Sequence, residues 1–322
     1  MIVFNLASFV LLPFVLLVLL IKRIWVKQGL SYEAIIEKKG MPEIVPLELK
    51  YQYDIHEEGW REGMSLSFRD LIFLFNLLPF TNGHLYFLLR SLLIVSVYSD
   101  MIRRHHPKVI MRHAEFAYSS SLLTEYCHRR RVKHINIQHG EKLFFIRDSF
   151  FHFDECYVWD QHYIDLFLSL RAEPSQFKVS IPPSMKVDVE KYSDKKYYAD
   201  YKYYLASYTE DVIKSIVQSM SFVRKEGKSI KYRPHPRYSD IILLKKFVKE
   251  EEIEYPQEVS ILQSISNIEY AVSSYSTVLV QAYFSGKKIL LDDVTYYDQY
   301  IKLSKMKYIL SQKNNGILSQ KQ

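Results

Sequence analysis

Segments typical of buried strands and of helices alternate along most of this chain, and no other feature of the sequence restricts its fold as much. The strand segments are short and rich in Val, Ile and Tyr, and longer amphipathic segments separate most of them. Strands that alternate with helices form parallel sheets with right-handed crossovers, so the sequence predicts an α/β fold. The predicted strands are KVIMRH (108–113), KHINIQHG (133–140), ECYVW (155–159), FKVSIPP (177–183), YYLAS (203–207), SIKYRPHPR (229–237), EYAVSS (269–274) and KKILLDD (287–293).

The alternation is interrupted once, by the polar and charge-rich stretch SMKVDVEKYSDKKYYADYK (184–202). Such a stretch is typical of a linker between domains, and a chain of 322 residues is long for one domain. We therefore expect two Rossmann-like lobes that face a cleft, over residues 23–185 and 186–322. Ligands of such sheets bind at the carboxyl ends of the strands.

The first 21 residues carry no charge, and at about 1.5 Å per residue a helix of this length crosses a hydrocarbon core of roughly 30 Å. Residues 1–22 are therefore predicted to be a membrane anchor. Lys22, Arg23 and Lys27 follow it, and the positive-inside rule keeps the remainder of the chain in the cytoplasm. No signal-peptide pattern is present. Pro13 leaves two alternatives open, a kinked single span of the inner (cytoplasmic) membrane and a re-entrant helix.

A second apolar region covers residues 70–107, but polar and helix-breaking residues interrupt it at intervals too short for a span. We expect a helical layer against a sheet, and an amphipathic face resting on a membrane is the alternative. The interrupting residues are Pro79, Asn82, Gly83, His84 and Arg90.

The charge balance favours an anionic partner. The formal net charge is +7 and the pI about 9.0, which suits an anionic ligand, an acidic membrane surface or a nucleic acid. No nucleic-acid-binding motif is visible, and the run HRRR (128–131) lies on a predicted surface helix, where charges are usually solvated. Cys127 and Cys156 lack metal-ligand spacing, so the sequence indicates a reducing compartment without a disulfide framework or a structural zinc site. No Asp-X-Asp pair stands at a predicted strand end, so no catalytic metal is expected either.

The first candidate motif, YRPHPR, ends a predicted strand at residues 232–237. The guanidiniums of Arg233 and Arg237 and the imidazole of His235 can donate charge-assisted hydrogen bonds to a phosphate. The two prolines between them fix the backbone. This pattern predicts a phosphate site.

The second candidate motif contains Ser273, Ser274, Ser276 and Thr277, which end one predicted strand and open a helix. Hydroxyl and backbone N–H groups at a helix N-terminus bind anions. Any helix also favours Ser or Thr at its start, so this motif predicts a phosphate site only together with the first.

The third candidate motif, INIQHGEK, places His139 after a predicted buried strand and before Gly140. Gly140 allows a tight turn that would expose the imidazole. A histidine near its ordinary pKa can accept the proton of an attacking hydroxyl, although a single histidine at a strand end is more often structural.

In order and spacing, "QHG", "RPHP" and the "SS…ST" cluster resemble bacterial GT-B glycosyltransferases of cell-surface polysaccharides over roughly residues 105–295. The combination is similar to sialyltransferases and Kdo transferases that use CMP-linked sugars, and it also resembles CDP-glycerol glycerophosphotransferases. The resemblance implies a GT-B fold with an acceptor-side N-terminal lobe and a donor-binding C-terminal lobe. It also implies a membrane-anchored glycosyltransferase of capsule, O-antigen or lipooligosaccharide synthesis.

The expected reaction moves a sugar, from a donor such as CMP-sialic acid or CMP-Kdo, to a hydroxyl of a lipid-linked or membrane-proximal saccharide. It needs no metal or cofactor and is inverting. The resemblance implies the following roles: His139 as catalytic base; His235, with Arg233 and Arg237, as the group that neutralises the leaving nucleotide; Ser273, Ser274, Ser276 and Thr277 as further phosphate ligands; and Gln281 as the ribose ligand, where many relatives carry Glu.

One departure from the family leaves the base open. The acidic motif that supplies it in many sialyltransferases has no clear counterpart, and Asp148, Asp154 and Glu155 are the loose candidates. Three alternative functions also stay open: a CDP-glycerol-type glycerophosphotransferase, a UDP-GlcNAc 2-epimerase-like enzyme and a non-catalytic basic binding protein.

Overall fold

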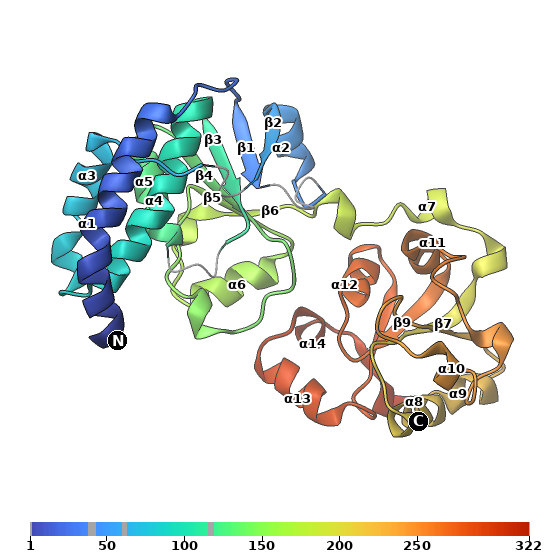
Figure 1. Ribbon diagram of the computed structural model, residues 1–322. Helices are drawn as coiled ribbons and strands as arrows, with labels where there is room; N and C mark the ends of the chain where they lie inside the picture. Colours follow the sequence, from blue (N-terminus) through green and yellow to red (C-terminus); the bar gives the residue numbers. More distant parts are fainter. Residues whose placement is uncertain (1, 38–42, 60–62, 115–118, 322) are drawn as a thin grey trace. The chain divides into compact units, whose positions relative to one another are not determined.

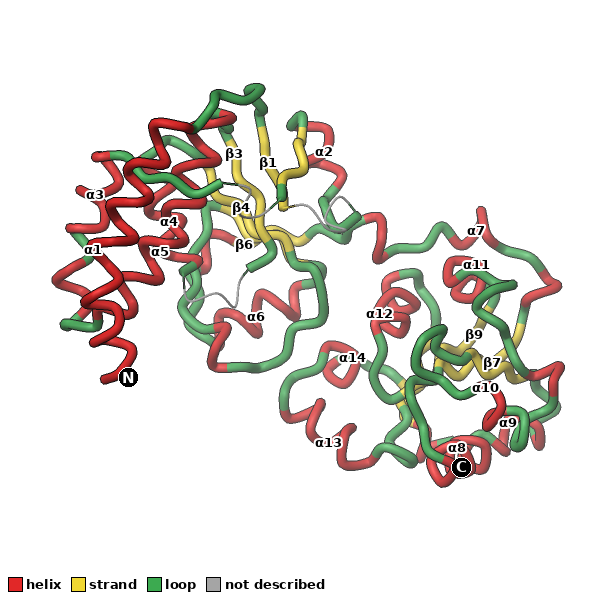
Figure 2. Tube along the Cα trace, viewed as in Figure 1, coloured by secondary structure: helices red, strands yellow, loops and turns green. Residues whose placement is uncertain are grey.

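The computed structural model describes residues 2–37, 43–59, 63–114 and 119–321, and these form two compact units. Unit 1 comprises residues 1–139 and 146–180, and unit 2 comprises residues 140–145 and 181–322. Figure 2 shows one group of strands flanked by helices in each unit. The predicted α/β class with two Rossmann-like units is confirmed by these two sheets, whose paired strands are all parallel.

The sheet of unit 1 has six strands in the order β2-β1-β3-β4-β5-β6. Four of them match the predicted segments, whereas β1 and β2 were not predicted, and β2 is half acidic. The strands are β1 (Ala34–Glu37), β2 (Ile55–Glu58), β3 (Val109–Arg112), β4 (Lys133–Ile137), β5 (Glu155–Val158) and β6 (Phe177–Val179).

Helices cover both faces of this sheet, as Figure 1 shows. Side chains alternate along β1, so that Ile35 packs under α4 and its neighbours while Ala34 and Ile36 pack with Leu49 of α2 on the other face. The helices are α1 (Ile2–Trp25), α2 (Leu47–Gln52), α3 (Phe68–Phe75), α4 (Leu85–His105), α5 (Ser120–Arg129) and α6 (Gln161–Ser169).

The N-terminal helix α1 is continuous through Pro13 and packs along α4 over its whole length. Near its start the Asn5 side chain accepts a hydrogen bond from the Tyr86 N–H at 3.1 Å, and near its end the Arg23 carbonyl accepts one from Arg103 at 2.8 Å. Its opposite face is exposed and apolar. In the described part of the chain, α1 and α4 are long and apolar enough to span a membrane, but α4 is mostly buried. Residues 70–107 thus form a helical layer against the sheet, as predicted.

The sheet of unit 2 has five strands in the order β11-β10-β9-β7-β8. Its β7 begins at Ala199 rather than Tyr203, so the end of the predicted linker is a strand. The strands are β7 (Ala199–Tyr204), β8 (Ile230–Arg233), β9 (Ile268–Ser273), β10 (Lys288–Leu291) and β11 (Gly316–Ile317).

The helices of unit 2 are short. Residues 209–227 form two helices that meet at Met220, and Gly227, with φ +69°, follows the second one. Within residues 240–252, one turn is α-helical. The helices are α7 (Val189–Tyr192), α8 (Glu210–Ser219), α9 (Ser221–Lys225), α10 (Ile241–Leu244), α11 (Ile261–Ser266), α12 (Thr277–Phe284), α13 (Tyr297–Lys305) and α14 (Ile309–Gln312).

Candidate functional site

The carboxyl edge of the unit 2 sheet carries two of the three motifs. Strand β8 lies on one side of β7 and β9 on the other, so the connections after β7 and β9 leave in opposite directions. In parallel sheets the ligand crevice forms at such a switch point. The loop after β8, with His235, and the loop after β9, with Ser274 and Ser276, both leave this edge.

Arg233 is the last residue of β8, and its side chain is buried rather than presented to the loop. One guanidinium nitrogen donates to Glu254 at 2.8 Å, and another donates to the Val259 carbonyl at 2.8 Å. Glu254 also accepts a hydrogen bond from the fully buried Lys202 at 2.5 Å. Arg233 therefore belongs to a buried ion-pair network beneath the loop, and its predicted contact with a phosphate stays a prediction.

His235 is half-buried, and its hydrogen bonds determine its tautomer. The backbone N–H of Arg237 donates to Nδ1 of His235 at 3.1 Å. Because an N–H group can only donate, Nδ1 is the unprotonated acceptor and Nε2 carries the hydrogen of the neutral ring. The ring also stacks on Tyr238, with centroids 4.5 Å apart. The imidazole thus presents a fixed N–H donor.

Ser239 fastens this loop to the loop after β7. Its hydroxyl accepts a hydrogen bond from the His235 N–H at 2.8 Å and donates one to the Ala206 carbonyl at 2.7 Å. Tyr208 adds a second link, since its hydroxyl donates to the Asp240 carbonyl at 2.6 Å. Burial raises the pKa of Tyr208 to about 12, so it remains a donor at neutral pH. Ser239 could not be recognised in the sequence, because a serine four residues beyond a histidine carries no distinctive signal.

Arg237 lies at the tip of the same loop and is exposed. Among the residues that the structure describes, no carboxylate lies within ion-pair distance of it. Its charge is therefore available to a ligand, unlike that of Arg233.

The loop after β9 contains both structural and available hydroxyls. Ser273 is buried and donates to the Tyr204 carbonyl at 2.8 Å, which joins β9 to β7. Ser276 is the N-cap of α12 and accepts from the Val278 N–H at 3.2 Å. In the described chain, the hydroxyls of Ser274 and Thr277 have no hydrogen-bond partner. These two groups can donate to an anion at the start of α12.

Gln281 lies one turn into α12, where its amide holds the segment that enters unit 2. Its Nε2 donates to the Ser184 carbonyl at 2.9 Å. The neighbouring Ser285 accepts from the Val187 N–H at 2.9 Å and supports the same segment. The ribose contact implied for Gln281 stays a prediction.

His139 is the last residue of unit 1 before the chain enters unit 2. Its ring is exposed and lies against that of His113, with centroids 4.6 Å apart and planes at 67°. Gly140 has open space where a Cβ would lie, and its φ is outside the left-handed region. The predicted tight turn is therefore not what exposes His139. His113 follows the neighbouring strand β3 and carries no motif in the sequence that marks it as a site residue.

The acidic alternatives for the base are engaged elsewhere. Asp154 accepts a hydrogen bond from the His134 N–H at 2.6 Å and also contacts His128. Glu155 accepts from Lys133 at 2.7 Å and from Lys178 at 2.6 Å. Asp148 is buried beside Arg147. His139 is exposed, whereas the side chains of these three carboxylates are at most 17% exposed, and it stays the predicted base.

No family model matches this chain, and a search of the curated proteins finds no match. Among solved structures, the chain is similar to a UDP-N-acetylglucosamine 2-epimerase, described as putative, from Listeria monocytogenes (TM-score 0.46, 10% identity, 84% of this chain and 82% of that one). It is also similar to the wall teichoic acid polymerase TagF (0.43, 10%, 83% and 72%) and to the calicheamicin glycosyltransferase CalG4 (0.47, 9%, 86% and 84%).

Proposed function

We propose that this protein is a membrane-associated transferase that takes a sugar from a nucleotide-linked donor, specifically a CMP-linked sugar, and transfers it to a saccharide hydroxyl. The observation that carries the proposal is the loop after β8, in which Ser239 fixes the backbone of His235 and leaves its Nε2–H and the Arg237 guanidinium available. Preorganised donors of this kind stabilise the negative charge that develops on a leaving phosphate.

In this proposal each group at the edge of the sheet has a distinct role. Nε2 of His235 and the guanidinium of Arg237 bind the phosphate oxygens that carry the leaving-group charge. Ser274 and Thr277 donate from the start of α12, whose dipole adds to the attraction. Arg233 supports the loop from beneath through its pair with Glu254.

His139 is the proposed base, and it accepts the proton of the acceptor hydroxyl as that oxygen attacks the sugar carbon. The bond from that carbon to the donor phosphate oxygen breaks in the same step, and the nucleotide leaves with the electron pair. Direct displacement of this kind inverts the configuration at the sugar carbon.

The membrane association rests on the exposed face of α1, which includes Phe9, Phe14 and Leu17, at 69%, 66% and 57% exposure. Because α1 packs along α4 in unit 1, we propose that this face enters one leaflet while unit 1 stays on the cytoplasmic side. The acceptor is then a lipid-linked or membrane-proximal saccharide of a surface polysaccharide.

The test compares two variants of His235 in the full chain, purified in detergent because α1 is part of the packing of unit 1. Gln can place its amide N–H near the position of Nε2, whereas Asn can only replace the acceptor at Nδ1. We expect His235→Asn to weaken nucleotide binding by about tenfold or more, and His235→Gln to retain most of it. Thermal unfolding with CMP, CDP, UDP and GDP measures both, since a nucleotide at 100 times its Kd stabilises by about 2.7 kcal/mol.

Lys225→Ala is the matched control, because it removes an exposed positive charge from unit 2 near the start of β8, at the opposite edge of the sheet. Stabilisation by CMP or CDP supports the proposed donor class, and stabilisation by UDP alone supports the epimerase alternative. Equal affinity in His235→Asn and the unmodified chain would refute the phosphate site. Unchanged turnover in His139→Ala would remove the proposed base.

A further inference from the structure

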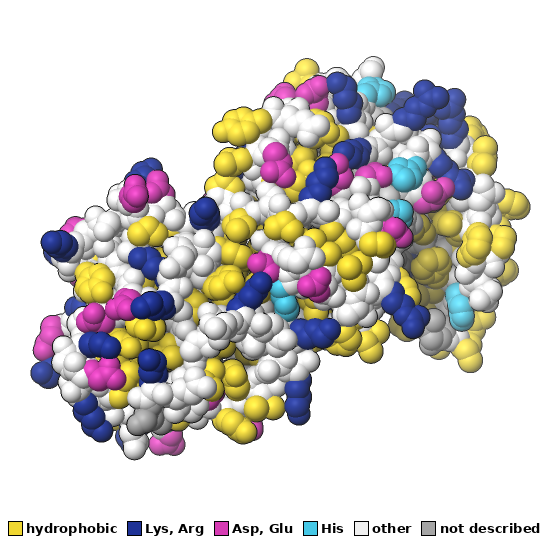
Figure 3. All heavy atoms as spheres, turned by 180° about the vertical axis from the view of Figure 1, so that it is seen from behind, with side chains coloured by type: hydrophobic (Ala, Val, Ile, Leu, Met, Phe, Trp, Pro, Cys, Tyr) yellow, Lys and Arg dark blue, Asp and Glu magenta, His cyan; other side chains and the backbone are white. Residues whose placement is uncertain are grey.

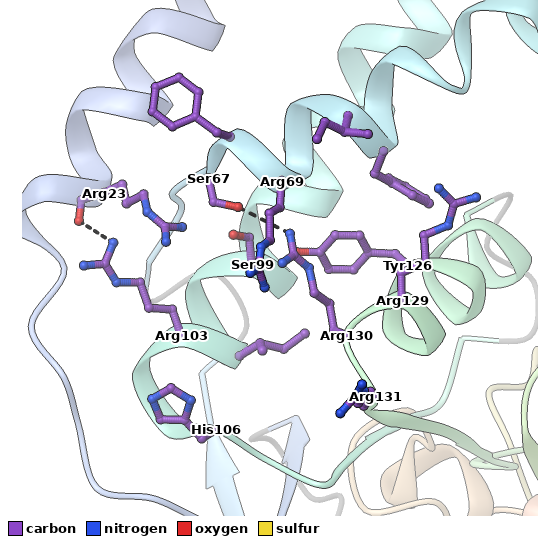
Figure 4. Close-up of a pocket in the computed structure, with 14 residues that line it drawn as sticks. Arg23, Ser67, Arg69, Ser99, Arg103, His106, Tyr126, Arg129, Arg130 and Arg131 are labelled. Carbon is purple, nitrogen blue, oxygen red and sulfur yellow. Dashed lines mark hydrogen bonds between the residues drawn. The ribbon is translucent and has the colours of Figure 1, made fainter.

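Unit 1 contains a cavity of about 1060 Å³ whose walls carry six arginines. The ends of four helices surround it: the last turns of α1 and α4, the start of α3 and the end of α5. Figure 4 shows guanidinium groups from all four converging on this space. The arginines are Arg23, Arg69, Arg103, Arg129, Arg130 and Arg131.

The carboxylates near the cavity neutralise only two of these charges. Arg129 pairs with Glu125 at 2.8 Å, and Arg130 pairs with Asp70. In the part of the chain that the structure describes, Arg23, Arg69, Arg103 and Arg131 have no carboxylate within ion-pair distance. The cavity therefore concentrates unbalanced positive charge, which attracts an anion of more than one charge.

Asp70 forms its ion pair with Arg130, and hydrogen bonds occupy both of its oxygens. It is fully buried and accepts hydrogen bonds from Ser67, Ser99 and Tyr126, at 2.5 to 2.7 Å, as well as from Arg130. Burial raises the pKa of this carboxyl, but the hydrogen bonds outweigh burial and hold the pKa below its ordinary value. Asp70 is thus a charged support for the wall rather than a counter-ion for the cavity.

Helix dipoles explain why some of these arginines lie where they do, but not why so many of them converge on one cavity. Arginine in the last turn of a helix is favourable, which accounts for residues of α1, α4 and α5 taken singly. It does not explain why three such ends meet, or why Arg69 of α3, a residue near a helix start, joins them. Planar guanidiniums bind phosphate oxygens two at a time, so several arginines around one space suit a phosphate group.

The rim of the cavity is apolar and exposed, and this feature distinguishes between a lipid and a soluble phosphate as the ligand. Phe68 and Ile72 line the cavity, yet they are 78% and 63% exposed. With Phe75 they form one face of α3, and Ile24 and Trp25 of α1 are 77% and 78% exposed. Figure 3 shows Lys and Arg side chains gathered at the upper right of the molecule, beside a margin rich in hydrophobic side chains. A soluble anion makes no favourable contact with such an apolar rim, whereas the acyl chains of a lipid can pack against it.

We propose that this cavity binds the phosphate headgroup of an anionic membrane lipid, with the arginines on the phosphate and the exposed faces of α1 and α3 against the acyl chains. The site is separate from the loop after β8 in unit 2 and does not depend on the proposed transferase activity. Phosphate-bearing lipids would then orient unit 1 on the membrane, in addition to the attraction that the apolar face supplies.

The test uses flotation of the full chain with vesicles of phosphatidylcholine alone and of phosphatidylcholine with phosphatidic acid. The variant Arg69→Gln/Arg131→Gln removes two charges whose side chains make no hydrogen bond within the described chain, so folding is preserved. We expect it to lose roughly thirtyfold in affinity for the phosphatidic acid vesicles, from the attraction of two basic residues to an anionic surface. Its binding to pure phosphatidylcholine stays unchanged.

The control Lys50→Gln/Arg171→Gln removes the same charge from exposed positions of unit 1 that do not line the cavity. We expect it to lose less than about threefold, because general surface charge contributes little outside the contact. Equal losses in both variants would overturn the proposal in favour of general electrostatic attraction. Inorganic phosphate that displaces the protein completely from the phosphatidic acid vesicles would instead identify a soluble anion as the occupant, and this also overturns it.

Discussion

Two arginine-rich regions of this chain differ in how their charges are balanced. In unit 2, Arg233 of the conspicuous YRPHPR motif is buried and paired with Glu254. In unit 1, the HRRR run looks like an ordinary solvated surface, yet Arg129, Arg130 and Arg131 form part of the wall of a cavity. An arginine's role therefore depends on its counter-charge in the fold, which a sequence motif does not reveal.

Within each region, the comparison also distinguishes arginines that support the fold from arginines that are available to a ligand. Arg233 and Arg130 are each paired with a buried carboxylate, and each lies beneath groups without such partners. Arg237 in unit 2 and Arg131 in unit 1 are exposed, and no carboxylate of the described chain pairs with them. Both regions thus share one arrangement: an arginine paired with a buried carboxylate, and a neighbouring exposed arginine that no carboxylate of the described chain neutralises.

The largest expected effect is on the stability of unit 2 when its buried carboxylate is removed. Glu254→Gln leaves Lys202 and Arg233 buried without a negative partner, and breaking a buried pair in this way costs about 3 to 5 kcal/mol. Hydrogen exchange of the amides in β7 and β8 measures the loss, because both strands carry members of the network.

The control for this variant is Glu226→Gln, whose carboxylate pairs with Lys228 at the surface at 2.8 Å. Exposed pairs contribute at most about 1 kcal/mol, so exchange in β7 and β8 changes little. Similar effects of the two substitutions would show that the Lys202–Glu254–Arg233 network does not support unit 2.

A smaller effect distinguishes the two units by their response to acid. His134 of β4 is fully buried and bonded to Tyr98 and Thr124, and burial lowers its pKa from 6.5 to about 3. The unfolded chain binds this proton more readily, so stability is full above about pH 6.5 and falls as the pH drops toward 3. At pH 5 unit 1 should lose about 2 kcal/mol relative to pH 7.

Tryptophan fluorescence during urea unfolding measures this loss for unit 1 alone, since the three tryptophans of the chain, Trp25, Trp60 and Trp159, all belong to it. Unit 2 has a single histidine, His235, so its amide exchange should depend less on pH over the same range. The variant His134→Gln cannot titrate and should remove most of the dependence. A wild-type curve that is flat between pH 7 and 5 would contradict the buried neutral state of His134.

Much of the fold could be predicted from the sequence, because burial of a strand or a helix leaves a regular pattern of apolar residues along it. The strands around His134 and Val272 lie in the interior of their sheets, and the β-branched and aromatic residues within them identified them. β2, the edge strand, lacked this signal because two of its four residues are glutamates, whereas the short β1 lies inside the sheet and was not predicted despite its apolar Ala34–Ile36. The start of β7 was hidden because its alternating Asp200 and Lys202 resemble a polar linker, although Lys202 is buried against Glu254.

Less of the candidate site could be predicted, because its chemistry depends on contacts between distant segments. The motif around His235 was visible, but the bond from Ser239 to Ala206 joins residues 33 positions apart. The pairing of Arg233 with Glu254 and the ring contact of His139 with His113 depend in the same way on tertiary structure. Residue types indicated a phosphate chemistry, whereas the fold decides which cations are available for it.

The smallest expected effect tests whether the backbone of the His235 loop must be fixed. Ser239→Ala removes the hydrogen bonds to the His235 N–H and the Ala206 carbonyl, each worth about 1 kcal/mol. Because the exposed loop can rebind water, we expect little change in thermal stability but about a fivefold loss of nucleotide affinity, as the loop must then be ordered by the ligand. Isothermal titration of the stabilising nucleotide measures this loss.

The matched control is Ser207→Ala, which removes an exposed hydroxyl of the loop after β7. If Ser239→Ala and Ser207→Ala bind the nucleotide with equal affinity, the cations of unit 2 act through their charge alone. They would then resemble the cations of the unit 1 cavity and would need no fixed loop.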